Sequence, residues 1–304
     1  MAEMLSKSAQ TLLKVAVALC GIPVGSKIPT VSELEASCES SRGNIQKALS
    51  TLKQTGAVEL EAHGQSGTFL TYIDYLSLAR TLGTRHLTGT MPLPYTLRYE
   101  GLATSLYTLL NADGIRAYIT FLRGSEARVQ MLLDESADYA VMSRMAYDEY
   151  VASGLPIQAA VECEPLSYVG HHVVLLQGEE PEDWTGARVG IDESSVDQRT
   201  LTRRYFEGKD VRYVPVQYTQ IVDLLMAGEL DAGIWNEDDL HVQAANLKQL
   251  YVDASVTSRD NTRAVVVVRD DDPFTRELLK ALATPAQIEE LQQQVMQGEL
   301  AVRY

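Results

Sequence analysis

The N-terminal fold is decided by Ile28–Leu70, which reads IPTVSELEASCESSRGNIQKALSTLKQTGAVELEAHGQSGTFL. Thr30 followed three residues later by Glu33 has the pattern of a capping box, so a helix should begin near Val31. Its apolar positions recur at helical spacing until the polar run at 39–41. A short helix with an abrupt polar stop predicts a tight turn into a second element.

The second element is also helical. Ser40 or Ser41 can cap it, and its buried stripe would consist of Ile45, Ala48, Leu49 and Leu52. Gly56 predicts a left-handed helix stop, and the alternation at 58–62, the polar tip at 63–67 and the return at 68–70 predict a β-hairpin. Two helices joined by a turn and followed by a hairpin describe a winged helix-turn-helix.

The exposed face of the second helix is polar and basic. It offers Arg42, Asn44, Gln46 and Lys47. The net charge of the whole chain is -15, yet residues 1–75 hold six Lys or Arg against seven Asp or Glu, and residues 40–58 hold three basic and no acidic side chains. Most of the acidic excess therefore lies outside this segment, and the local charge of the helix suits the phosphates of DNA.

The same stretch is similar to the GntR-type winged-helix module, whose pattern runs Leu-Pro-Ser-x-x-x-Leu, Ser-Arg-x-Thr-Val, Leu, Gly-Leu/Val and Gly-x-Gly-Thr-Phe. The matching positions are Ile28, Pro29, Thr30, Leu34, Ser41, Arg42, Ile45, Ala48, Leu49, Leu52, Gly56, Val58, Gly67, Thr68 and Phe69. Two positions depart from it: Val31 or Ser32 replaces an arginine of the first helix, and Gln65 or Ser66 replaces the basic residue of the wing.

The resemblance implies roles in binding double-stranded DNA. Thr30 and Ser41 would donate to phosphate, and the tip of the wing would lie along the minor groove or the backbone. Arg42 would lie closest to a base or a phosphate. The residues expected to enter the major groove are Arg42, Asn44, Gln46 and Lys47, and those expected at the wing are Gly64, Gln65, Ser66 and Gly67.

The N-terminal apolar run could be mistaken for a lipoprotein leader, because it ends at Cys20. Lys14 interrupts the run, Glu3 spoils a basic leader, and the bulky Leu19 stands where a small residue is wanted. We therefore expect the first helix of the winged domain here. No run is long enough to span a membrane.

Three cysteines, Cys20, Cys38 and Cys163, cannot make a disulfide framework. They fit a reduced, cytoplasmic compartment. The helical spacing of apolar residues at 73–82 then predicts a linker helix, which either packs on its own winged domain or joins two copies in a homodimer.

From residue 95 onward, strands and helices alternate, which predicts an α/β fold with largely parallel sheets. Strands are expected at 95–99, 116–122, 138–142, 170–176, 188–191, 212–216, 232–235 and 264–268. Helices are expected at 102–110, 126–133, 198–206, 219–227, 273–283 and 285–297.

Two segments share one pattern: a helix that ends in a leucine pair, an acidic turn, a short apolar strand and a polar residue. They are VQMLLDESADYAVMSR at 129–144 and IVDLLMAGELDAGIWNED at 221–238. This duplication resembles the type 2 periplasmic-binding-protein fold, in which two α/β lobes clamp a ligand. A GntR-like module followed by such a domain resembles the YhfZ family of regulators across the whole chain.

The expected organisation is thus α/β, with an N-terminal winged helix-turn-helix and a two-lobed α/β domain of the type 2 periplasmic-binding-protein kind. The winged domain would span 1–72, the linker 73–94 and the bilobal domain 95–304. Within the latter, the first lobe would comprise about 95–168 and 264–304, and the second about 169–263.

In such a clamp, ligands bind where strands end and helices begin. Ser125 and Ser194 are also expected to cap helices. Arg123 and Arg144 favour an anionic ligand, whereas Glu100 and Asp192 favour one that carries an amine, so its charge stays open. The candidate ligand-binding residues are Tyr99, Glu100, Gly101, Arg123, Gly124, Ser125, Ser143, Arg144, Asp192, Ser194, Ser195, Trp235 and Asn236.

No catalytic motif supports an enzyme. His171 and His172 are strand neighbours that point to opposite faces, so they cannot chelate one metal ion together. Phosphate-loop, nucleophile-elbow and dinucleotide fingerprints are absent from the sequence. We expect no catalytic residue, metal or cofactor, but a DNA-binding regulator with a small-molecule effector. The alternative is a binding module or enzyme whose winged domain contacts protein.

Overall fold

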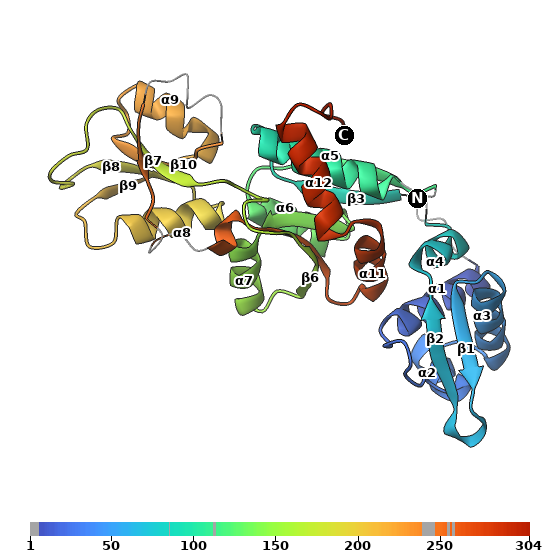
Figure 1. Ribbon diagram of the computed structural model, residues 1–304. Helices are drawn as coiled ribbons and strands as arrows, with labels where there is room; N and C mark the ends of the chain where they lie inside the picture. Colours follow the sequence, from blue (N-terminus) through green and yellow to red (C-terminus); the bar gives the residue numbers. More distant parts are fainter. Residues whose placement is uncertain (1–5, 85, 112–113, 239–246, 254–255, 257–258) are drawn as a thin grey trace. The chain divides into compact units, whose positions relative to one another are not determined.

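The computed structural model describes residues 6–84, 86–111, 114–238, 247–253, 256 and 259–304 (Figure 1). The chain divides into two compact units. The N-terminal unit comprises Met1–Leu87, Leu110–Ala117 and Asp270–Leu282, and the two-sheet unit comprises Thr88–Leu109, Tyr118–Arg269 and Ala283–Tyr304. No helix within the described residues is long and apolar enough to cross a membrane.

The N-terminal unit contains a helix-turn-helix followed by a β-hairpin wing, as the sequence predicts. The Glu33 N–H donates to Thr30 Oγ1 at 3.3 Å and the Thr30 N–H donates to Glu33 Oε2 at 2.7 Å, which confirms the capping box. Ser41 stands at the N-cap of the next helix without a side-chain capping bond. The elements are α1 (Lys7–Cys20), α2 (Val31–Cys38), α3 (Arg42–Gln54), β1 (Val58–Ala62), η1 (Gly64–Ser66), β2 (Thr68–Ile73) and α4 (Tyr75–Leu82).

The core of this unit lies between the three helices and the wing. Both α1 and α2 pack on α3, and β1 and β2 pair antiparallel. The apolar stripes that the sequence shows are the faces that meet, because burying them is the main driving force for packing. Fully buried side chains include Val15, Leu19, Leu34, Ile45, Leu52 and Leu70.

One helix from the C-terminal part of the chain belongs to this unit. α11 (Pro273–Leu282) packs against α1 and α4, with Leu278 and Leu279 fully buried. The linker helix α4 therefore packs on its own chain.

All three cysteines are free and buried. Burial, with Asp272 and Glu277 nearby, raises the pKa of the Cys20 thiol to about 12.

The first lobe of the two-sheet unit is a five-stranded sheet in the order β4-β3-β5-β12-β6. β3 and β5 are parallel, whereas β12 returns antiparallel between β5 and β6. Its strands are β3 (His86–Met91), β4 (Arg116–Phe121), β5 (Tyr139–Ser143), β6 (Ile157–Glu162) and β12 (Ala264–Arg269). Its helices are α5 (Leu97–Leu110), α6 (Ser125–Leu133), α7 (Arg144–Ala152) and α12 (Pro285–Met296).

The second lobe is a five-stranded sheet in the order β11-β7-β10-β8-β9. β8 is parallel to β9 and β10, and β7 is antiparallel to β10 and β11. Its strands are β7 (His172–Leu176), β8 (Arg188–Ile191), β9 (Arg212–Pro215), β10 (Ala232–Asn236) and β11 (Lys248–Tyr251). Helical segments are α8 (Val196–Tyr205), η2 (Tyr218–Gln220) and α9 (Ile221–Met226), and η3 (Arg259–Thr262) precedes the return to β12.

The duplicated pattern occupies equivalent places in the two lobes. Each leucine pair lies at the end of a helix, α6 or α9, and each following apolar run is an internal, fully buried strand, β5 or β10. The expected two-lobed α/β architecture is therefore present, but the expectation of largely parallel sheets is wrong, because β12 and β7 pair antiparallel with both of their neighbours.

The strand expected at 95–99 is wrong. Thr96 Oγ1 accepts the Tyr99 N–H at 3.1 Å and helps start α5, whose stripe of buried apolar residues outweighs the β-propensity of the tyrosines. The preceding strand β3 was not expected, since Gly89 suggests a break. A Cβ on Gly89 would lie 2.0 Å from the Tyr139 ring, so this glycine permits close packing inside a strand.

Candidate functional site

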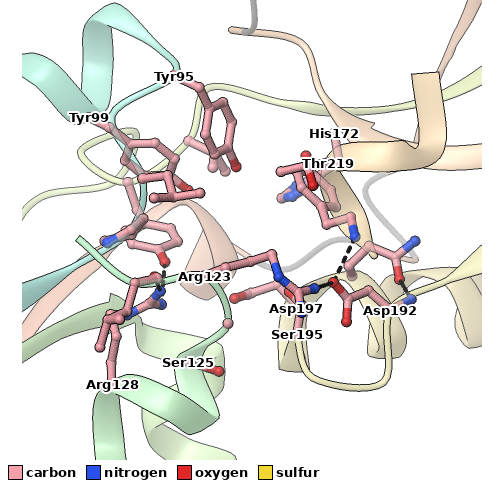
Figure 2. A pocket seen from close by; sticks show the side chains of 18 residues that line it. Tyr95, Tyr99, Arg123, Ser125, Arg128, His172, Asp192, Ser195, Asp197 and Thr219 are labelled. Carbon is pink, nitrogen blue, oxygen red and sulfur yellow. Dashed lines mark hydrogen bonds and ion pairs between the residues drawn. The ribbon is translucent and has the colours of Figure 1, made fainter. Parts of the chain in front are cut away.

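A cleft of about 650 Å³, including its open mouth, lies between the two lobes of the two-sheet unit. Figure 2 shows side chains from both lobes facing it. Arg123, Gly124 and Ser125 follow β4, and Asp192 and Ser195 follow β8. The cleft thus lies where strands end and helices begin, as in other open α/β folds, and its size suits a small molecule.

Arg123 and Asp192 join the two lobes across the cleft. Arg123 Nη1 donates to Asp192 Oδ2 at 2.7 Å, and Asp192 Oδ2 also accepts the Tyr218 N–H at 2.7 Å. The other oxygen, Oδ1, accepts both the N–H and the hydroxyl of Ser194, at 3.0 and 2.6 Å. The buried Asp192 carboxylate is therefore compensated by a cation and fully hydrogen-bonded.

Arg128 is a second cleft arginine, and it is only 3% exposed. Its guanidinium donates from Nε to Val141 O at 3.0 Å, from Nη1 to Leu122 O at 2.9 Å and from Nη2 to the Tyr168 hydroxyl at 3.2 Å. These bonds fix the orientation of the guanidinium, but all three acceptors are uncharged. The backbone and one tyrosine thus hold a cation at the wall of the cleft (Figure 2).

Asp197 faces the cleft from the second lobe. Its two oxygens accept the Ser143 hydroxyl, at 2.7 and 2.8 Å. Burial raises the pKa of the Asp197 carboxyl to about 6, although the Ser143 hydroxyl and the nearby Arg128 act to lower it. At neutral pH the carboxylate is therefore still mostly ionised.

His172 lines the cleft and lies where the chain passes from the first lobe into the second. Its Nδ1 lies 2.9 Å from Asn261 Nδ2, and burial lowers the pKa of His172 to about 4. Asp238 raises that pKa and His171 lowers it further, both to a smaller extent. The imidazole is neutral at pH 7, so Nδ1 accepts the amide N–H of Asn261.

Aromatic rings cover much of the remaining wall. Tyr218 stacks on Trp235, with ring centroids 4.1 Å apart and planes 5° apart. Tyr99 packs edge-on against both Tyr95 and Tyr168, at 5.4 and 5.1 Å. Four of these five side chains line the cleft, while Trp235 supports Tyr218 from behind.

About half of the predicted ligand-binding residues lie in the cleft lining. These are Tyr99, Arg123, Gly124, Ser125, Asp192 and Ser195. The predicted residues outside the lining are Glu100, Gly101, Ser143, Arg144, Ser194, Trp235 and Asn236. Contact with a ligand stays a prediction for all thirteen.

Packing and pairing explain the second group. Gly101 meets Gln292 of α12, where an added Cβ would lie 3.0 Å away. Glu100 lies near Tyr304, whose pKa is raised by burial and then by this carboxylate. Arg144 is engaged by Asp148 and Glu162, each at 2.8 Å, and is not free to hold an anion.

The other predicted residues outside the lining support the residues that form it. Ser143 caps α7 by accepting the Ala146 N–H at 3.0 Å and donates to Asp197. Asn236 is buried, and its N–H donates to the Tyr218 hydroxyl at 2.8 Å.

Two predicted helix caps are wrong. Gly124, with φ at +75°, occupies the N-cap of α6, so Ser125 is the first helical residue and its hydroxyl bonds Tyr150 at 2.9 Å. Ser195, not Ser194, stands at the N-cap of α8, and Ser194 is held by Asp192 instead.

Arg128 and Asp197 were missed by sequence reasoning. Arg128 occupies the buried stripe of α6 together with Ser125, Val129 and Leu132, so a charged residue at an apolar position was a usable signal. Asp197 lies in the first turn of α8, where an acidic residue is ordinary, so it carried no such signal.

The DNA-reading face predicted for the N-terminal unit is open. Arg42, Gln46 and Lys47 are exposed on α3, Asn44 is half-buried, and Thr30 and Ser41 are exposed beside them. At the wing Gly64, Gln65 and Ser66 are exposed, and Gly67 is half-buried.

A groove between α3 and the wing adds two cations that sequence reasoning did not assign. It is lined by residues that include Lys27 and Lys53. A Cβ on Gly67, whose φ is +101°, would lie 2.3 Å from Lys27 Cε, so the lysine stem lies against the tip of the wing. Lys27 therefore supplies a positive charge beside the tip of the wing, which carries no Lys or Arg of its own.

Within the described residues there is no group of three or more His, Cys, Asp or Glu side chains that could hold a metal ion.

Comparison with known proteins matches both parts of the chain. A family model described as the YhfZ C-terminal domain matches residues 74–304, and one described as a helix-turn-helix domain matches residues 23–70. The chain is 36% identical, over 293 residues, to the uncharacterized protein YhfZ of Escherichia coli (strain K12), covering 94% of each.

Solved structures agree. The crystal structure of YhfZ from Shigella flexneri matches with a TM-score of 0.63 and 33% identity, covering 76% of this chain and 98% of that one. An ancestral arginine-binding protein bound to arginine matches with a TM-score of 0.52 and 12% identity, covering 71% of this chain and 99% of that one. At that identity the second likeness shows only that the fold is that of two-lobed binding proteins. On the family models and the close relatives, this chain belongs to the YhfZ family.

Proposed function

We propose that this protein is a transcription regulator that binds operator DNA through its N-terminal unit and senses a small-molecule effector in the cleft of its two-sheet unit. The observation that carries the proposal is the combination in one chain of a helix-turn-helix with an exposed, cationic α3 and a cleft that two lobes build together. A DNA reader acts where the DNA is, so the proposal places the protein in the cytoplasm.

The roles proposed for the DNA-contacting residues follow the resemblance to the GntR-type winged-helix module. α3 enters the major groove, where Arg42 reaches a base edge or a phosphate and Lys47 neutralises a phosphate. Thr30 and Ser41 donate to the backbone, and the wing lies along the minor groove with Lys27 beside it. A single short helix reads few base pairs, so a homodimer on paired half-sites supplies the remaining specificity.

The effector acts by differential binding. Arg123 with Asp192, and Ser143 with Asp197, are polar contacts between the two lobes, and a ligand among them stabilises one lobe arrangement over another. Such a ligand changes operator affinity only if the two arrangements differ in that affinity. The cleft needs no chemistry for this role, and we propose no enzymatic activity.

Fluorescence anisotropy on DNA from upstream of the protein's own gene tests the DNA reader. The variant Arg42→Ala/Lys47→Ala should bind about tenfold more weakly or worse, because it loses a charge-assisted contact and a phosphate contact. The slope of the logarithm of the binding constant against that of the salt concentration is negative, and it should become shallower by about 1 for each phosphate contact that the variant loses.

The matched control is Arg204→Ala/Arg212→Ala, which removes the same charge from exposed positions of the second lobe. It should bind DNA as the parent protein does. Equal binding by the α3 variant would eliminate α3 as the reading helix.

One observation favours a second function. Strand β1 of the wing carries Glu59 and Glu61 exposed, and the tip of the wing has no Lys or Arg. These features suit an N-terminal unit that contacts a protein partner rather than DNA. Absent or salt-insensitive DNA binding by the parent protein would support this alternative.

A further inference from the structure

Two opposite charges face the cleft, and neither has an ion-pair partner. Among the residues that the structure describes, no carboxylate lies within ion-pair distance of Arg128 and no cation lies within that distance of Asp197. Arg123 and Asp192 differ from them, because they satisfy each other at 2.7 Å. The unpaired charges come from opposite lobes, Arg128 on α6 and Asp197 on α8.

Arg128 and the start of α6 form a site for an anion. A guanidinium has five N–H donors, and Arg128 uses three of them on Val141, Leu122 and Tyr168. No side chain caps α6, whose N-cap is Gly124, so the partial positive charge of the first turn also faces the cleft. A buried cation without a counter-ion is costly, and an anionic ligand group would remove that cost.

Asp197 forms a site for a cation. Its oxygens accept the Ser143 hydroxyl and the backbone N–H of Asp197 itself, which leaves acceptor capacity on the carboxylate. Its pKa of about 6 leaves it ionised at neutral pH, and a bound cation would hold it ionised to lower pH. Arg128 and Asp197 both line the same cleft, so one small molecule bound there can reach both charges.

We propose that the effector is a compact zwitterion of the free α-amino acid class, with its carboxylate on Arg128 and the first turn of α6 and its ammonium group on Asp197. This inference rests on the proposed function only in naming the ligand of that same cleft. A ligand with only a negatively charged group would leave Asp197 without an ion-pair partner. A ligand with only a positively charged group would leave Arg128 without one. The contacts between the lobes restrict the ligand to a small molecule.

The competing explanation is that Arg128 and Asp197 merely neutralise each other across the cleft. Binding measurements with paired ligand analogues distinguish this explanation from the proposed zwitterion site. Isothermal titration calorimetry of the full chain, without DNA, against the common free amino acids should find at least one binder. Its amide, which lacks the carboxylate charge, and its deaminated carboxylic acid, which lacks the ammonium group, should each bind at least tenfold more weakly.

Variants provide the second comparison. Asp197→Asn keeps an acceptor for Ser143 but removes the charge, and should weaken the amino acid at least tenfold while leaving the deaminated acid unchanged. Asp148→Asn, at an exposed aspartate paired with Arg144, is the matched control and should bind as the parent does. Arg128→Met should lose the amino acid altogether, and the Asp197 variant keeps the test decisive should Arg128→Met fail to fold.

Absence of any binder among the free amino acids would overturn the inference, as would a deaminated acid that binds as tightly as its parent. These outcomes differ from failure of the proposed function. An amino acid that binds the cleft without changing operator affinity would support the inference and sink the regulatory coupling. Operator binding by a protein that binds no amino acid would overturn the inference and leave the DNA reader supported.

Discussion

Asp192 and Asp197 lie five positions apart, and both line the cleft, yet their surroundings differ. Asp192 receives four hydrogen bonds, one of them from the Arg123 guanidinium. Asp197 accepts the Ser143 hydroxyl and the backbone N–H of its own residue, and burial raises its pKa. The sequence indicates Asp192, because it follows a strand end, but not Asp197 or Arg128. Their significance depends on which lobe faces which, and that is a long-range property that no local pattern contains.

The pH dependence of stability should report on Asp197. Its folded-state pKa of about 6 exceeds its ordinary value of 3.8, so the folded state binds the proton more tightly than the unfolded chain does. Stability therefore falls as pH rises through that window, by at most about 3 kcal/mol. The Asp197→Asn variant has no carboxyl group at this position, so it does not lose stability in this way as pH rises. In urea denaturation without ligand, the variant should gain stability relative to the parent as pH rises from 3.8 to about 6.

His172 does not disturb this comparison. Its pKa, lowered to about 4 by burial, gives the opposite slope, since the neutral imidazole of the folded state is lost as pH falls. Both proteins contain His172, so its effect cancels in the difference. A difference in unfolding free energy that stays constant with pH would show that Asp197 titrates normally.

At the scale of elements, sequence reasoning succeeds where a local cause suffices. The capping box starts α2, Gly56 with φ at +71° ends α3, and the buried strands β5, β10 and β12 are largely apolar runs in the sequence. It fails for β3, where Gly89 is required by a ring from another strand. Sequence reasoning also assigns α11 to the first lobe, because an amphipathic pattern does not indicate which element the helix packs against.

The packing of α11 can be tested by hydrogen exchange. Leu278→Ala removes a fully buried side chain from α11 and should cost about 2–5 kcal/mol of unfolding free energy. Amide protection should fall in α1 and α4, the helices that α11 contacts. Lys280→Ala, on the exposed side of the same helix, should change stability by less than about 0.5 kcal/mol. Loss of protection confined to the sheets of the two lobes would contradict this packing.

At the scale of the whole molecule, the DNA reader and the cleft belong to different compact units. A regulator needs coupling between them, and coupling has one thermodynamic requirement that holds whatever the route. If the effector changes operator affinity by some factor, the operator must change effector affinity by the same factor. This equality requires no knowledge of how the units are arranged.

The last prediction is therefore a reciprocity test. The dissociation constant of the operator is measured with and without saturating effector, and that of the effector with and without saturating operator. The two ratios should agree, and a typical allosteric factor is about 5 to 150. Arg123→Gln, which weakens the tie between the lobes at Asp192, should change both ratios together, whereas Arg188→Gln, at an exposed pair with Asp231, should change neither. Ratios of one in both directions would leave a DNA binder and a ligand binder that share a chain without regulating each other. Unequal ratios would require a further equilibrium, such as dimerisation, whose dependence on protein concentration then becomes the quantity to measure.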